Sequence, residues 1–185
     1  LNADGKPDLT IANTGVSGNP GNFLFYKNNS IQGDISFAPS VKTTNTSGPV
    51  KIGHVDFNGD GKQDLLVSNG SDLNAIHVYP NTSTGGNLSF GTSILLTGQL
   101  GPFKAAFGDF DSDGKPDIAF ISAYSSSVLI YQNTSTGGAI SFGPRLTFPG
   151  TQFTGSIVTT DIDQDGKTDI VINSNTNYLL ALRNT

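Results

Sequence analysis

The sequence predicts an all-β fold built from repeated four-stranded sheets, and three observations support this prediction. Gly5, Gly61, Gly114 and Gly166 occupy the same place in four similar stretches and are separated by 56, 53 and 52 residues. Short apolar runs bounded by turn residues recur within each period, as strands do. No segment of the 185 residues has sustained helical periodicity, and 23 Gly, 9 Pro and no Glu also disfavour helices.

Each period contains the same elements in the same order. An Asp-rich window is followed by an apolar run such as "IAFIS" (118–122) and then by a second strand such as "VLIYQN" (128–133). A turn such as "NTSTGG" leads into a third strand, for example "SFGPRLTF" (141–148), and a fourth strand such as "FKAAFG" (103–108) runs into the next window. Four strands in about 50 residues is the size of a β-propeller blade.

Residues 1–185 are therefore interpreted as a single β-propeller region of four repeats, approximately 1–49, 50–102, 103–154 and 155–185. The first repeat lacks the strand that precedes its window and the last lacks the strand that follows the "NTSTGG" turn, which predicts fourteen strands grouped as three, four, four and three. A propeller leaves few open edges only when its ring closes. We therefore expect an arc or fragment of a larger propeller, or a ring completed by blades from the same or another chain.

The acidic residues indicate a cation site. All 15 are Asp, and 13 of them fall in the four windows 2–8, 56–64, 109–117 and 161–169. Carboxylates a few ångströms apart repel one another unless a positive charge lies between them, and surface charge selected only for solubility would be scattered and mixed with Glu. The clustering therefore favours bound cations.

Alternate window positions supply the expected ligands. Numbered from the first Asp, positions 1, 3, 5 and 9 carry side-chain oxygens, and position 7, always Lys, offers its backbone carbonyl while its side chain points to water. The candidate metal ligands are Asp56, Asn58, Asp60, Lys62 and Asp64; Asp109, Asp111, Asp113, Lys115 and Asp117; Asp161, Asp163, Asp165, Lys167 and Asp169; and Asn2, Asp4, Lys6 and Asp8. Oxygen ligands without His or Cys select a hard cation, and the number of ligands and the flexibility of the loop favour Ca²⁺ over Mg²⁺. Since the first window starts at position 2, we expect three complete calcium loops and one truncated loop.

The residues of the windows allow two other interpretations. An EF-hand loop needs Glu at position 12, where this chain has Ile11, Val67, Phe120 and Ile172, so that class is excluded. Asp and Gly also form simple turns without any metal. Four copies at a fixed period favour the metal.

The windows, the later "SFG" segment and the "Y-x-N" strand together resemble the FG-GAP/VCBS repeat family, whose calcium loops also occur in the integrin alpha-chain β-propeller. The resemblance covers essentially the whole chain. It implies a propeller, commonly seven-bladed. It also implies that Ca²⁺ lies in the loop linking the first two strands of a blade, which here are the strands before and after each Asp-rich window. It further implies an extracellular or cell-surface location; residues 1–185 show no signal peptide, so targeting information is expected to have been removed or to lie outside this stretch.

Three function classes remain open. The first is an extracellular adhesion or interaction module in which Ca²⁺ is a structural staple; the second is a lectin-like carbohydrate-binding propeller whose Ca²⁺ keeps an open coordination position. The third is a non-catalytic propeller segment of a secreted polysaccharide-processing enzyme. No catalytic residue is assigned, because no Ser lies in a nucleophile-elbow context. The expected partners are cell-surface proteins or glycans.

Composition excludes other partners. The formal charge is -5 and there are only two Arg, Arg145 and Arg183, so a nucleic-acid partner is not expected. The absence of Cys excludes a disulfide framework and thiolate metal sites. No apolar run is long enough to span a bilayer, which predicts a soluble molecule without membrane insertion.

Several further residues have structural interpretations. His54 and His77 occupy strand positions where other repeats have apolar residues or Thr, and so they are not interpreted as catalytic bases. Tyr26, Tyr79 and Tyr131 recur at the repeat period and are expected to pack in the core, with a sugar-stacking row as the alternative. N-x-S sequons, interpreted mostly as turns, occur at Asn28, Asn45, Asn69, Asn81, Asn87 and Asn133.

Overall fold

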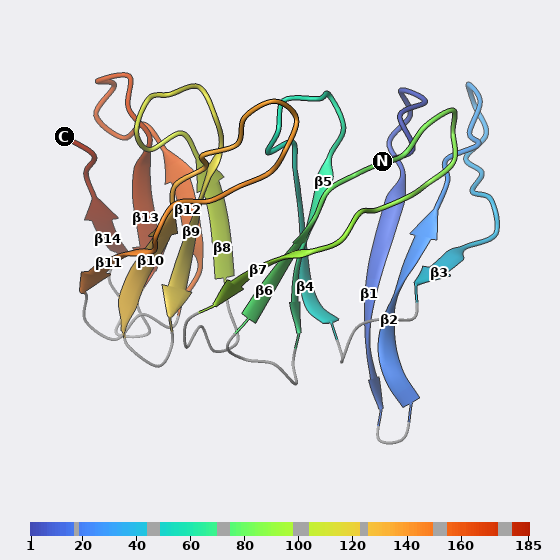
Figure 1. The fold of residues 1–185 in the computed structure, drawn as a ribbon, viewed down its shortest axis with the longest axis horizontal. Helices are drawn as coiled ribbons and strands as arrows, with labels where there is room; N and C mark the ends of the chain where they lie inside the picture. Colours follow the sequence, from blue (N-terminus) through green and yellow to red (C-terminus); the bar gives the residue numbers. More distant parts are fainter. Residues whose placement is uncertain are drawn as a thin grey trace. The chain divides into compact units, whose positions relative to one another are not determined.

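The chain folds into fourteen strands in the residues that its structure, a computed structural model, describes (Figure 1). The described residues are 1–16, 19–43, 49–69, 75–97, 104–122, 126–149, 155–173 and 179–185. Within these ranges no helix has the length and apolar character needed to span a bilayer. The all-β prediction is confirmed.

The strands form four antiparallel sheets of three, four, four and three strands, as the sequence predicts. The first sheet contains β1 (Leu9–Val16), β2 (Asn19–Tyr26) and β3 (Val41–Thr43). The second contains β4 (Pro49–Val55), β5 (Asp64–Asn69), β6 (Ala75–Tyr79) and β7 (Ile94–Thr97). The third contains β8 (Lys104–Gly108), β9 (Asp117–Ser122), β10 (Ser127–Tyr131) and β11 (Leu146–Pro149). The fourth contains β12 (Ile157–Thr160), β13 (Asp169–Asn173) and β14 (Leu179–Leu182).

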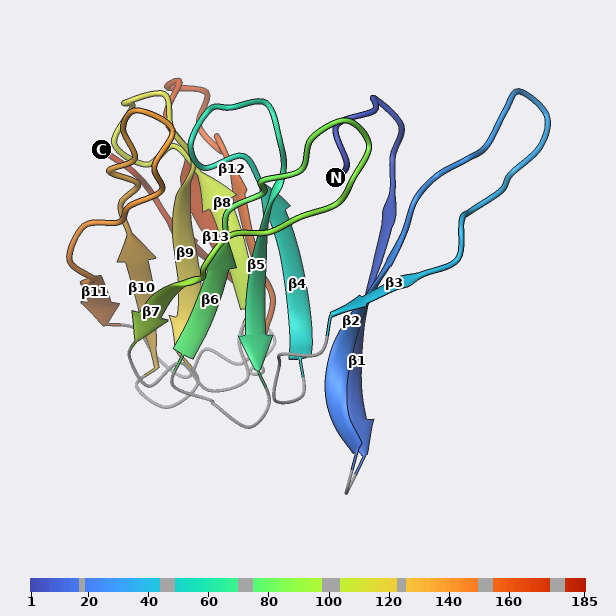
Figure 2. The ribbon, with the colours of Figure 1, turned by 45° about the vertical axis from the view of Figure 1, so that its right-hand side comes forward.

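Each sheet is a meander in which strands adjacent in sequence are also adjacent in space (Figure 2). In the third sheet, Phe120 of β9 lies between Ala105 of β8 and Leu129 of β10. All six residues of β9 are buried, whereas all four residues of β11 are exposed. Burial on both faces explains why the strands after the windows are apolar at consecutive positions.

The third strand of each repeat differs from its prediction. The segment "SFG" is not part of β7 or β11; its Phe instead forms an isolated bridge with the Asn that follows the second strand, as in Asn81↔Phe90 and Asn133↔Phe142. The amide of Gly143 then donates to the carbonyl of Gln132 at 2.9 Å. These bonds close a turn around Gly137 and Gly138, whose φ angles of 60° and 80° interrupt regular pairing.

The chain divides into two compact units, Leu1–His54 with Lys62–Leu96, and Val55–Gly61 with Thr97–Thr185. In the first unit, Phe23 and Phe25 of β2 pack with Leu65 and Val67 of β5. The second unit has its own core between two sheets, in which Ile121 of β9 and Val128 of β10 pack with Ile172 of β13. Each unit thus buries apolar side chains between neighbouring sheets.

The core of the second unit is expected to depend on Ile172, which is fully buried. Ile172→Ala should lower the free energy of unfolding by about 2–5 kcal/mol, because it leaves a cavity between β9 and β13. Val158→Ala, a change on the 55% exposed Val158 of the neighbouring strand β12, should cost less than about 1 kcal/mol. Urea unfolding followed by circular dichroism measures both losses; equal losses would contradict this assignment of the core.

Candidate metal centre

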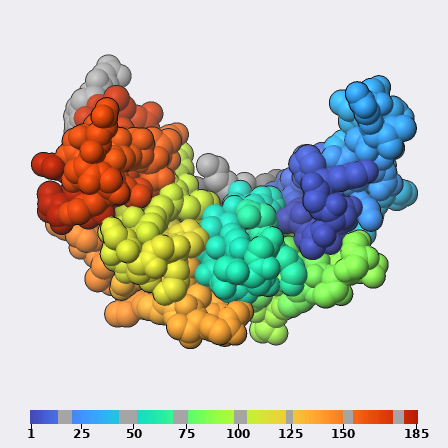
Figure 3. All heavy atoms as spheres, turned by 90° about the horizontal axis from the view of Figure 1, so that it is seen from above, coloured from blue at the N-terminus to red at the C-terminus, as the bar shows by residue number. Residues whose placement is uncertain are grey.

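The four Asp-rich windows are tight loops, and the second, third and fourth of them precede strands that are mostly buried, β5, β9 and β13. In the second unit, residues 109–117 connect β8 to β9 and residues 161–169 connect β12 to β13. Figure 3 looks onto this end of the sheets, where the yellow spheres around residue 110 lie at the surface. The loops therefore lie at the ends of the strands, at the protein surface.

The loops curl because two of their residues have left-handed backbone conformations. The sixth position is glycine in every window, with φ of 83°, 81°, 84° and 88° at Gly5, Gly61, Gly114 and Gly166, as predicted. The fourth position is also left-handed in every window, although it is glycine only at Gly59, with φ of 72°. The other three residues there are Ala3, Ser112 and Gln164, with φ of 62°, 61° and 62°.

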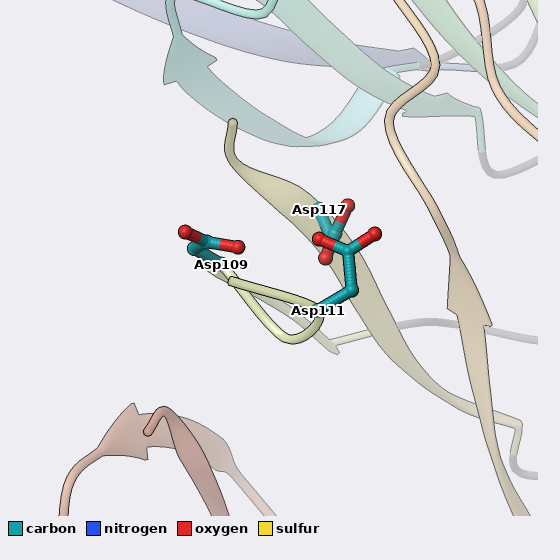
Figure 4. A group of neighbouring side chains, drawn as sticks. All are labelled: Asp109, Asp111 and Asp117. Atoms are coloured by element: carbon teal, nitrogen blue, oxygen red, sulfur yellow. The ribbon is translucent and has the colours of Figure 1, made fainter. Parts of the chain in front are cut away.

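Two windows bring three carboxylates together. In the third window, Asp109, Asp111 and Asp117 place one oxygen each within 4.8 Å of one another, and Figure 4 shows their side chains around a common space. In the fourth window Asp161, Asp163 and Asp169 do the same. These are the predicted ligand positions 1, 3 and 9. Such a set of oxygens could hold a divalent cation.

The carboxylate at position 1 also closes its own loop. Asp109 accepts hydrogen bonds from the amides of Asp113 at 3.0 Å and Gly114 at 2.8 Å. Asp161 accepts the equivalent bonds from Asp165 at 3.2 Å and Gly166 at 2.9 Å. In the second window Asp56 accepts from Gly59 and Gly61, both at 2.8 Å. These inward N–H groups hold the loop closed around the first carboxylate.

The fifth position does not join the three-carboxylate clusters. Asp113 accepts from the backbone of Lys115 at 2.9 Å and pairs with its ammonium group at 2.8 Å. The Lys115 side chain stays partly exposed and turns back to Asp113 at the surface, because opposite charges two residues apart in the loop attract. In the fourth window, one carboxylate oxygen of Asp165 accepts a hydrogen bond from the Lys167 amide at 2.9 Å. The other lies 3.5 Å from the Arg183 guanidinium group.

The ninth position is the buried part of the site. Asp64, Asp117 and Asp169 are at most 1% exposed. Asp117 accepts N–H bonds from Phe110 at 2.9 Å and Asn133 at 2.7 Å. The same pair of bonds reaches Asp169 from Ile162 at 2.9 Å and Asn184 at 2.8 Å. Asp117 and Asp169 thus each bind the second residue of their own window and the asparagine that follows the second strand.

The two clusters differ electrostatically. Burial raises the pKa of Asp117, and the negative charges of Asp111 and Asp113 raise it further, against the two N–H bonds that lower it. The pKa of Asp169 is lowered by the N–H groups of Asn184 and Ile162, and the charge of Arg183 also lowers it. Arg183 pairs with Asp163, and so it partly neutralises the fourth window. Each window thus has one paired cation, Lys115 in the third and Arg183 in the fourth, but only in the third is the pKa of the ninth-position carboxylate raised.

The first two windows contain fewer converging carboxylates. In the first, the buried Asn2 donates its side-chain amide to Asp4 at 3.0 Å, and Lys27 lies 3.6 Å from Asp4. The N–H bond from Lys6 and the bond from Asn2 lower the pKa of Asp4. Asp4 and Asp8 are the two carboxylates of this truncated window.

In the second window, position 3 is Asn58, whose side-chain amide donates to the carbonyl of Gly138 at 2.8 Å.

An asparagine after the second strand connects each window to the preceding one, a role that the sequence analysis missed. The side-chain amide of Asn133 donates to the carbonyls of Phe57 at 2.9 Å and Pro116 at 3.1 Å. Asn81 donates in the same way to Leu1 and Gln63, both at 2.8 Å, and Asn184 donates to Phe110 at 2.8 Å. Leu1, Phe57 and Phe110 all stand at position 2 of the preceding window, so we call this contact the asparagine latch.

The latch also explains the turn that follows. The side-chain oxygen of Asn133 accepts from the amide of Ser135 at 2.9 Å, and the hydroxyl of Ser135 accepts from Ser141 N–H at 3.1 Å. Asn81 with Ser83 and Asn28 with Ser30 repeat the first bond at 3.0 Å and 2.8 Å. The interpretation of these three sequons as turns is confirmed. Asn45 lies outside the described residues, and Asn69 lies in β5.

The remaining residues have the expected structural roles. His54 contacts Thr10 at 3.2 Å from β4, and burial lowers the pKa of His54. His77 lies in β6 and stacks on Tyr79 with ring centroids 6.0 Å apart. Tyr131 is 5% exposed, donates its hydroxyl to the Thr97 carbonyl at 2.6 Å and packs in the core as expected.

A family model described as an FG-GAP-like repeat matches the chain three times, over residues 1–67, 56–120 and 119–172. Each matched stretch includes at least one Asp-rich window and all or most of the strand that follows it. The matches together extend over residues 1–172 of the 185.

The asparagine latch is expected to contribute strongly to stability. Asn133→Ala removes the donor from the carbonyls of Phe57 and Pro116, and each buried group left unpaired costs about 1–3 kcal/mol, so we expect a loss of about 2–4 kcal/mol. Asn87→Ala is the matched control, because Asn87 is exposed and the third repeat has Ala139 at the same place. Thermal and urea unfolding measure both variants. A loss at Asn133 no larger than that at Asn87 would show that the latch bonds are not stabilising.

Proposed function

Because this chain belongs to the FG-GAP-like repeat family, we propose that it is a calcium-binding module of a β-propeller. The four antiparallel sheets, which follow the sequence repeat, are assigned as its blades. In this proposal Ca²⁺ occupies the Asp-rich loops and acts mainly as a structural staple. The module serves adhesion or recognition outside the cell or at its surface, where members of this family typically occur, and no catalytic role is assigned.

The observation that carries the proposal is the pair of three-carboxylate clusters. In the third window a buried carboxylate, Asp117, lies beside Asp109 and Asp111, and the pKa of Asp117 is raised by burial and by the charges of Asp111 and Asp113. A divalent cation would reverse this electrostatic cost, because it favours the ionised form of all three groups. Carboxylate and carbonyl oxygens are the ligands that Ca²⁺ takes.

The same geometry supports a mainly structural role for Ca²⁺. Asp109 holds loop amides and Asp117 holds the amide of Asn133, so a cation bound between them would fix the loop to the end of the second strand. The fourth window has the equivalent connections through Asp161 and Asp169. Metal binding at such a site adds to the free energy of folding, since an unfolded chain does not present the ligands together.

Metal removal tests this proposal. If Kd is about 10⁻⁴ M, within the range of extracellular calcium modules, then 10 mM Ca²⁺ adds about 2.7 kcal/mol for each site. For a chain of this length, that raises Tm by about 5–10 °C per occupied site. We expect this rise with Ca²⁺, a smaller one with Mg²⁺, and its loss with chelator, in scanning calorimetry alongside a metal count. The absence of both a shift and bound metal would leave the windows as turns alone.

Substitutions at window position 1 test whether Ca²⁺ binds at the two three-carboxylate clusters. Asp109→Ala and Asp161→Ala should each remove one bound Ca²⁺ and the corresponding part of the Ca²⁺-dependent rise in Tm. Asp34→Ala is the control, since Asp34 lies outside the windows in the exposed turn at 31–34. Each variant is compared with and without chelator, which separates lost metal binding from lost hydrogen bonds. An unchanged calcium response in the Asp109→Ala, Asp161→Ala double variant would place the calcium elsewhere.

A further inference from the structure

One position beside each window differs in charge from repeat to repeat. It is the residue that immediately precedes the asparagine at the end of the second strand, and we call it the pre-asparagine residue. The residues at this position are Lys27, Pro80, Gln132 and Arg183. Two of them are cations, one is a neutral amide and one has no polar side-chain atom. The charge at this position is therefore a property of the individual repeat.

In the second unit, the pre-asparagine side chain contacts the window of its own repeat. Gln132 donates its side-chain amide to the carboxylate of Asp111 in the third window. The guanidinium group of Arg183 pairs with Asp163 in the fourth window and lies 3.5 Å from Asp165. The two repeats thus make the same contact with side chains of different charge.

The first repeat has a related contact. The ammonium group of Lys27 lies 3.6 Å from Asp4, at the fifth position of the first window. In the second repeat, Pro80 has no side-chain donor for such a contact. The contact therefore occurs in each of the three repeats whose pre-asparagine residue is polar.

In the third and fourth windows the contact falls on a carboxylate of the three-carboxylate cluster. Asp111 and Asp163 both stand at the third window position, and each belongs to the cluster of its window. The paired lysine of the third window, in contrast, contacts a carboxylate outside the cluster. The third-position carboxylate thus has a neutral donor, Gln132, in the third window and a cation, Arg183, in the fourth.

We propose that the pre-asparagine residue sets the calcium affinity of its window, an inference that rests on the calcium binding proposed above. Gln132 makes the third window the tighter site, and Arg183 makes the fourth the weaker one. A guanidinium group at the cluster repels a divalent cation and competes with it for Asp163. The Arg183 side chain is 61% exposed, so the high dielectric of water applies. Under that condition, a unit charge about 5 Å from a divalent cation weakens its binding on the order of tenfold.

The test follows each window separately while calcium is added. Amide signals of Gly114 and Gly166 are recorded in two-dimensional NMR spectra of isotope-labelled, chelator-treated protein. These amides donate to the position 1 carboxylates of the third and fourth windows at 2.8 Å and 2.9 Å, so each reports on its own window. We expect the Gly114 signal to change at a lower calcium concentration than the Gly166 signal.

Exchanging the two residues isolates their effect from other differences between the windows. Gln132→Arg should raise the Kd of the third window roughly tenfold, and Arg183→Gln should lower that of the fourth by a similar factor. In each variant the other window should keep its affinity, which also shows that the fold is intact. Arg183→Lys, which keeps the charge, should leave the fourth window close to its original affinity. Added salt should reduce both changes, because exposed charges are screened.

Arg145→Gln is the matched control. Arg145 is the other arginine of the chain, is exposed and lies outside the windows, so its replacement changes the net charge by the same amount. We expect both windows to keep their affinities in this variant. An effect on the fourth window as large as that of Arg183→Gln would attribute the change to net charge and overturn the assignment to the pre-asparagine residue.

The outcomes also separate this inference from the calcium proposal itself. Calcium responses at both glycines that the exchange of residues leaves unchanged would overturn the inference, while the calcium proposal would stand. The lack of any calcium-dependent change at either glycine would reject both.

Discussion

Burial of a charged aspartate at the ninth window position is the constraint from which the rest of the repeat follows. Asp117 is 1% exposed, and a carboxylate in such a place must have polar partners. Its partners come from two directions, the start of its own loop at Phe110 and the end of the second strand at Asn133. A single side chain therefore fixes where the loop begins, where β9 begins and where β10 ends. Asp169 repeats the arrangement with Ile162 and Asn184.

The curled loop follows from this anchor. With position 9 fixed, the position 1 carboxylate can fold back over the loop only if the chain reverses quickly, and the left-handed residues at positions 4 and 6 achieve that reversal. Backbone N–H groups then point inward to the first carboxylate. The carboxylates of positions 1, 3 and 9 approach one another as a consequence, which concentrates negative charge where a cation can lie. The left-handed backbone at positions 4 and 6 and the repulsion among the carboxylates at positions 1, 3 and 9 therefore belong to the same loop site.

The repeat, the sheet composition and the glycine at position 6 could be predicted from the sequence, because each depends on local patterns that recur at a fixed period. The left-handed fourth position could not, since Ala3, Ser112 and Gln164 share no side-chain property that signals it. The turn of Asp113 towards Lys115 was also missed, because two opposite charges within a loop compete with the ligand geometry. The asparagine latch joins residues 76 positions apart in the case of Asn133 and Phe57, and no local pattern encodes that contact.

The asparagine latch gives the repeat a direction. The side-chain amides of Asn81, Asn133 and Asn184 each donate to the carbonyl at position 2 of the window in the repeat before. Each repeat is therefore secured by its successor and not by its predecessor. In a repeat array whose stability is carried by neighbour contacts, unfolding of one repeat then removes the asparagine that holds the window before it, so that fraying travels towards the amino terminus, one repeat after another.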